Sequence, residues 1–173
     1  MRKLLDRLYG ICVAAAAIMI AGICLLVTAQ VLANIITKFG GRQINLTIPS
    51  YADFAGYMLA AASFMALAYT LRTGRHIRVT LITGLLPDRV QFALELLTVF
   101  MGVVISGVAT FYMAHLCIES FTYNDMSPGI IAVPIYLPQI PVAFGLAVLT
   151  IAFIDTFVET LRAGRPVIET QEM

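Results

Sequence analysis

The residues that could do chemistry in this chain are few, and they stand near the ends of apolar segments. His115 precedes Glu119 by four positions, so the two side chains can share one helix face and exchange a hydrogen bond. Cys12 and Cys24 would lie about 18 Å apart along a helix at 1.5 Å per residue, which is too far for a disulfide. With Cys117 they form no CxxC motif, so we interpret the three cysteines as small apolar side chains at helix contacts.

Several kinds of chemistry need groups that the apolar segments do not provide. A proton- or ion-coupled carrier is expected to place a carboxylate at mid-membrane, but the segment centres contain no Asp, Glu, Lys, Arg or His. A thiol oxidase needs paired cysteines, and a metalloenzyme needs clustered His, Asp or Glu. Asp155 stands at the end of the last segment, where Arg162 could approach it two turns later. We therefore predict no catalytic residue, no cofactor, no metal site and no autonomous transport.

Composition and hydropathy place the chain in a membrane. Of its 173 residues 60% are hydrophobic and 12% are charged, whereas soluble proteins carry about 25% charged residues. The net charge of +1 gives no indication of nucleic-acid binding. We predict an all-α integral membrane protein with a single domain over residues 1–173. Its four transmembrane helices are expected at about 8–37, 54–71, 96–118 and 138–157.

The positive charges predict the orientation of these helices. Nine of the eleven Lys and Arg lie in the two tails and in the loop between the second and third apolar runs. Short segments rich in Lys and Arg stay in the cytoplasm, so both termini are expected there. The first run is longer than the roughly 7–15 residues of a signal-peptide core, and it is expected to remain as an anchor.

The segments around the apolar runs carry weaker patterns. Apolar and polar residues interleave over 76–86, which predicts an amphipathic helix lying in the membrane interface. The tail 167–173 is expected to be disordered. Gln30, Asn34 and Thr37 share one face of the first helix and should contact protein, either this chain or a partner.

Small residues recur about one helical turn apart in the second and third runs. This spacing lets two membrane helices approach closely. The predicted packing positions are Gly56, Ala60 and Ser63 in the second run, and Gly102, Ser106, Thr110 and Ala114 in the third.

Two stretches resemble the small membrane subunit (DctQ-type, or Q subunit) of tripartite ATP-independent periplasmic (TRAP) transporters. The first is the run AYTLRTGRHIRVTLITGLLPDRVQFALELL, which contains the Gly-x-His-Ile-x-Val pattern of that family. The second is the approach to the last span, where the family has a proline, an aromatic residue, and then Pro-x-Gly-Phe. In this chain the first pattern comprises Gly74, His76, Ile77 and Val79, with Arg75 and Arg78 between them and Arg72 before them, and the second comprises Pro134, Tyr136, Pro141 and Phe144.

The resemblance extends over essentially the whole chain, with three departures. Ala143 stands where glycine is common, and Thr80 stands where an acidic residue often follows the His-Ile-x-Val segment. The chain has no Trp, and residues 51–53 replace the Trp and acidic pair that often precede the second span.

The resemblance implies a non-catalytic small subunit of a sodium-driven importer in the bacterial inner membrane. Such an importer takes up organic anions, such as carboxylates, that a periplasmic substrate-binding protein delivers. The small subunit would scaffold a large elevator-type transport subunit and contact membrane lipids, without contacting the substrate or any nucleic acid. The alternatives are a free-standing four-helix channel or carrier and a membrane redox enzyme.

Several interpretations are open for the residues of the middle loop and of the outer rim. The loop arginines could set orientation and meet anionic lipid headgroups. His76 could instead bond a helix end, or the loop could contact the large subunit. The outer rim could contact the binding protein or be simply solvated, and its charged residues are Lys38, Arg42, Asp53 and Glu119.

Overall fold

The computed structural model describes residues 2–39, 46–73 and 87–163, which form four helices. All four are long and apolar enough to cross a membrane, which confirms the prediction of an all-α membrane protein. The predicted interfacial helix and the tail 167–173 lie outside the described residues. The helices are α1 (Arg2–Phe39), α2 (Tyr51–Arg72), α4 (Asp88–Tyr123) and α5 (Tyr136–Ala163).

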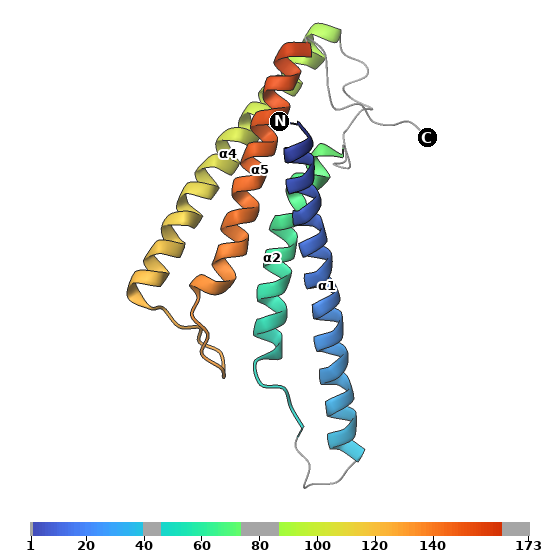
Figure 1. The fold of residues 1–173 in the computed structure, drawn as a ribbon, viewed down its shortest axis with the longest axis vertical. Helices are drawn as coiled ribbons and strands as arrows, with labels where there is room; N and C mark the ends of the chain where they lie inside the picture. Colours follow the sequence, from blue (N-terminus) through green and yellow to red (C-terminus); the bar gives the residue numbers. More distant parts are fainter. Residues whose placement is uncertain (1, 40–45, 74–86, 164–173) are drawn as a thin grey trace.

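The helices alternate in direction between two ends of the molecule (Figure 1). At one end α1 and α4 begin and α2 and α5 finish, and we call it the tail end. At the other end lie the connecting segments 46–50 and 124–135, and we call it the loop end.

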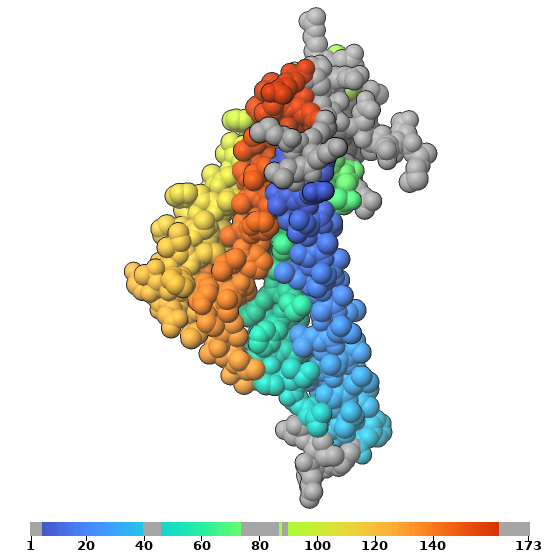
Figure 2. Space-filling model, viewed as in Figure 1, coloured from blue at the N-terminus to red at the C-terminus, as the bar shows by residue number. Residues whose placement is uncertain are grey.

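The four helices form one layer in which α1 packs on α2, α2 on α5, and α5 on α4. The order in space therefore differs from the order in the sequence, because α5 lies between α2 and α4. The pair α4–α5 leans away from α1–α2 toward the loop end (Figure 1). Figure 2 shows the same layer in space-filling form, with α1 and α4 along its two edges. Such an arrangement leaves most of the apolar surface of each helix uncovered within this chain.

The helices extend beyond the apolar runs that hydropathy marks. α1 has 38 residues and is about 57 Å long at 1.5 Å per residue, whereas the hydrocarbon core is about 30 Å thick. It must therefore tilt or project from the membrane. α4 likewise continues into polar residues until Asn124, whose left-handed backbone (φ 53°) ends the helix.

The buried core lies where α1, α2 and α5 meet in their tail-end halves. Half of its residues are alanine or cysteine, so the helices can pack closely there. Its members are Tyr9, Cys12 and Ala16 of α1, Ala62, Met65, Ala68 and Leu71 of α2, and Val148, Leu149 and Ala152 of α5.

The backbones of α2 and α5 come into contact at Gly145 of α5. A Cβ added at this position would lie 2.6 Å from the carbonyl carbon of Phe64 and 2.8 Å from the amide nitrogen of Met65. Only glycine lets the backbones of α2 and α5 meet at this distance. This crossing fixes the two central helices of the layer against each other.

Candidate functional site

An ion-pair cluster joins α2 to α5 at the tail end. Arg72, the last residue of α2, places Nη1 2.8 Å from Oε2 of Glu159 and 3.4 Å from Oδ2 of Asp155. Its guanidinium also lies 3.5 Å from the hydroxyl of Thr156. The two carboxylates stand one turn apart on α5, so a single cation bridges both. We call these four residues the tail-end cluster.

The sequence associated Asp155 with Arg162, on the same helix, and assigned Arg72 to the signature loop without predicting that it pairs with Asp155. In the structure Asp155 pairs with Arg72, and Arg162 is exposed. The pair joins residues that are far apart in sequence and exists only because α5 packs on α2. Spacing along one helix cannot reveal such a partner, but scarce charges at two helix ends on the same membrane side would have been a usable signal.

Tyr9 of α1 adds a third helix to this region. Its side chain is 2% exposed and belongs to the buried core, within electrostatic range of Arg72 and Asp155. Among the described residues its hydroxyl has no hydrogen-bond partner. The tail ends of α1, α2 and α5 are thus gathered around a small polar centre.

At the loop end the segment 124–135 folds back onto the start of α2. The hydroxyl of Tyr57 donates to Oγ of Ser127 at 2.7 Å, and the amide of Ile131 donates to Oγ of Ser50 at 2.9 Å. Gly129 lies against the predicted rim residue Asp53, where a side chain at 129 would collide with the carboxylate. Asp53 is therefore part of a packed contact within this chain.

The polar face of α1 contacts this chain's own connecting segment. Oε1 of Gln30 accepts a hydrogen bond from the amide of Ile48 at 2.9 Å, and Nε2 donates to Asn34. Oγ1 of Thr37 accepts from the amide of Leu46 at 3.1 Å. The sequence left open whether this face contacts this chain or a partner. In the structure it contacts this chain.

The remaining sequence-predicted residues are placed as follows. Lys38 is exposed at the end of α1, and Pro141 stands inside α5. Pro134 forms an isolated antiparallel β-bridge with Met126. The ring centroid of Tyr136 lies 5.3 Å from that of Phe121, whereas Phe144 is 46% exposed. Outside the described residues lie Arg42 and, in the signature loop, Gly74, Arg75, His76, Ile77, Arg78 and Val79.

The two small-residue faces have different surroundings. On α4, Gly102 is packed against the ring of Phe153, Ser106 is buried, and Thr110 hydrogen-bonds to Thr150 of α5 at 3.0 Å. Ala114, the last of that set, is exposed. On α2 the whole predicted face is exposed in this chain, and it comprises Gly56, Ala60 and Ser63.

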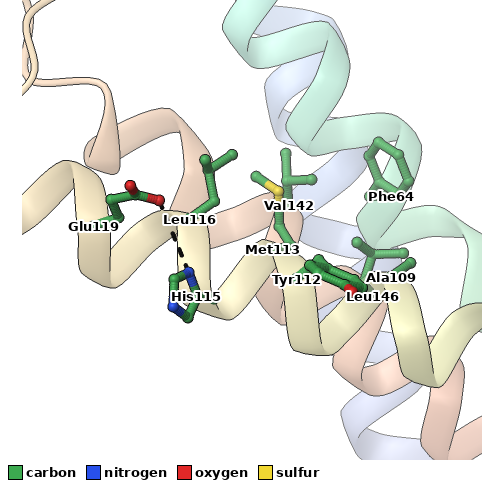
Figure 3. Close-up of a pocket in the computed structure, with 9 residues that line it drawn as sticks. All are labelled: Phe64, Ala109, Tyr112, Met113, His115, Leu116, Glu119, Val142 and Leu146. Atoms are coloured by element: carbon green, nitrogen blue, oxygen red, sulfur yellow. Dashed lines mark ion pairs between the residues drawn. The ribbon is translucent and has the colours of Figure 1, made fainter.

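A groove of about 490 Å³ runs beside α4 (Figure 3). At one end lie His115 and Glu119, with Nδ1 and Oε2 3.8 Å apart. Toward the other end the figure shows Phe64 of α2, Ala109 of α4 and Leu146 of α5. Tyr112, Met113, Leu116 and Val142 complete the lining.

Metal-ligand geometry is not found in the part of the chain that the structure describes. No three His, Cys, Asp or Glu side chains come together there as ligands would.

Comparison with known protein families identifies the family of this chain. A family model described as the DctQ component of tripartite ATP-independent periplasmic transporters matches residues 23–163, which is most of the chain. No curated protein matches it. The matched region covers α2, α4, α5 and most of α1, together with the basic segment between α2 and α4.

Proposed function

Because this chain belongs to the DctQ family, the small membrane component of TRAP transporters, we propose that it scaffolds the large transport subunit of a sodium-driven organic-anion importer. Members of this family are multi-pass proteins of the bacterial inner membrane and work with a large membrane subunit and a substrate-binding protein. The family match over residues 23–163 carries the proposal. Sodium coupling, the organic anion and the elevator-type partner come from the family resemblance.

The single layer of helices supports a scaffolding role. A free-standing channel or carrier needs an interior that a solute can enter, whereas these helices are arranged side by side. Arg72 ties α2 to α5 at the tail end, and the two backbones meet at Gly145. At the loop end Tyr57 ties α2 to the segment 124–135 that leads into α5. A rigid plate of this kind could give a moving subunit a fixed reference in the membrane.

We propose that the exposed small-residue face of α2 contacts the large subunit. Gly56, Ala60 and Ser63 present little side-chain bulk, and a Cβ at Gly56 would meet nothing within 4 Å in this chain. Membrane helices associate through such faces because the backbones can come close. The face extends from the loop-end half of α2 to just past its middle.

The two ends of the molecule receive different roles in this proposal. The tail end, with most of the Lys and Arg, would face the cytoplasm. Arg75, His76 and Arg78 of the signature loop would there contact lipid headgroups or the large subunit. The loop end would face the periplasm, where Lys38 and Arg42 are candidates to touch the binding protein, while Asp53 would support the segment 124–135.

Co-purification tests the proposal. The tagged full-length chain, expressed with the large subunit encoded alongside it, is expected to recover that subunit in a stable complex. Ala60→Leu should lower the recovered large subunit about tenfold, because overpacking costs about 1–3 kcal/mol and 1.4 kcal/mol corresponds to tenfold in affinity. The measurement is the ratio of the two subunits after size-exclusion chromatography.

Ala29→Leu is the matched control, because Ala29 is a small exposed residue on α1, away from the proposed face. It should leave the ratio unchanged. Recovery of the chain alone as a stable monomer or homo-oligomer would contradict the scaffold role. Transport by the reconstituted chain without a partner would favour the free-standing carrier.

A further inference from the structure

The groove beside α4 has an apolar floor and a single acidic mouth. We propose that it binds one phospholipid of the leaflet at the loop end, with an acyl chain along the groove and a primary ammonium headgroup at Glu119. Phosphatidylethanolamine has this chemistry. The site goes beyond the scaffold role and would exist whether or not a partner subunit is present.

The length and the polarity of the groove match one lipid tail. Its lining on α4 extends from Ala109 to Glu119, ten residues or about 15 Å along the helix. That is half of the roughly 30 Å hydrocarbon core, the depth of one leaflet. Glu119 stands one turn from the end of α4, at headgroup level, and the lining deeper than His115 is apolar or aromatic.

The charge at the mouth selects the headgroup. The Glu119 side chain is 49% exposed, and its ion-pair partner within the described residues is His115. The sequence has no Lys or Arg between Arg42 and Arg72 or between Arg89 and Arg162, so the loop ends of α2, α4 and α5 supply no permanent cation.

A lipid ammonium can supply that cation. A primary ammonium donates charge-assisted hydrogen bonds to a carboxylate, whereas the quaternary ammonium of phosphatidylcholine has no N–H to donate. The anionic headgroup of phosphatidylglycerol would be repelled. His115 lies beside Glu119, where an imidazole N–H would be able to donate to a phosphate oxygen of the same headgroup.

Native mass spectrometry of the full-length chain in mild detergent tests the site. The protein is titrated with dioleoyl-phosphatidylethanolamine, dioleoyl-phosphatidylcholine and dioleoyl-phosphatidylglycerol. The ethanolamine lipid is expected to bind at least tenfold more tightly than the other two. Glu119→Gln should weaken its binding about tenfold and leave the choline lipid unchanged, while Ala109→Phe should weaken all three.

Asp125→Asn is the matched control, because it removes one exposed carboxylate from the loop end outside the groove, and it should change nothing. Equal affinities for the three lipids, or a Glu119→Gln variant with unchanged preference, would overturn the headgroup assignment. Because Glu119 is on the surface, this variant decides the question even if Ala109→Phe does not fold. A photo-crosslinker at Leu116 that captures protein instead of lipid in native membranes would also overturn the proposal. The lipid titrations do not require the large subunit, so their failure would leave the proposed scaffold role standing.

Discussion

At the scale of single residues, Arg72 is the side chain that joins α2 to α5 at the tail end. Its side chain is 16% exposed, and its guanidinium bridges two carboxylates of α5 that are 33% and 22% exposed. Removing one member of a largely buried ion pair is costly, because the partner charge is left without compensation. Here two carboxylates would lose their common cation.

Arg72→Gln is expected to destabilise the protein by about 2–3 kcal/mol, below the usual 3–5 kcal/mol for a fully buried pair because the carboxylates are partly exposed. The measurement is thermal unfolding in detergent. Glu159→Gln on the Arg72→Gln background should restore part of the loss, giving a non-additive double-mutant cycle. Arg162→Gln, at the same end and exposed, is the control and should have almost no effect. Additive effects of the two cluster variants would show that the pair contributes no coupling.

At the scale of elements, the layer depends on the crossing of α2 and α5. These helices approach to backbone contact at Gly145 and are joined again by Arg72 at the tail end, while Tyr57 joins α2 to the segment that precedes α5. By contrast, α1 and α4 are at the edges and contact one neighbour each over their length. The central pair is therefore the rigid part of the molecule.

Gly145→Ala should separate α2 from α5 and cost about 1–3 kcal/mol, because the new methyl group would collide with the backbone at Phe64. Gly10→Ala is the matched control, since a Cβ there meets nothing within 4 Å in this chain. That control should be neutral or stabilise α1 by up to about 1 kcal/mol, the difference in helix propensity. Circular dichroism melts of both variants check the prediction, and equal melting temperatures would contradict it.

The sequence was sufficient for the number and nature of the helices, because long apolar runs leave few alternatives in a membrane. Two of the small residues that it placed on one face of α4, Gly102 and Thr110, lie against Phe153 and Thr150 of α5. It did not reveal that α5 lies between α2 and α4, so spacing along one helix did not lead to the pairing of Arg72 with Asp155. Nor did it reveal the groove, whose lining comes from three helices.

At the scale of the whole molecule, orientation is the property that the charges predict. Reporter fusions test it directly: a periplasm-active phosphatase should be silent at either terminus and active when inserted after residue 43. Reversing two charges of the amino-terminal tail with Arg2→Glu and Lys3→Glu should weaken this pattern of phosphatase activity without abolishing it, because the basic segment between α2 and α4 remains. Phosphatase activity at either terminus of the unaltered chain would reverse the assignment of the two ends.

The position of α5 between α2 and α4 has a consequence for synthesis. Arg72 leaves the ribosome 87 residues before Glu159. At about 5–20 residues per second it waits roughly 4–17 s for its counter-charge. During that interval it is a free cation that the translocation machinery can read. Afterwards α5 must insert between helices that are already present. Arg72, whose charge helped to orient the nascent chain, then forms the ion pair that holds α5 to α2.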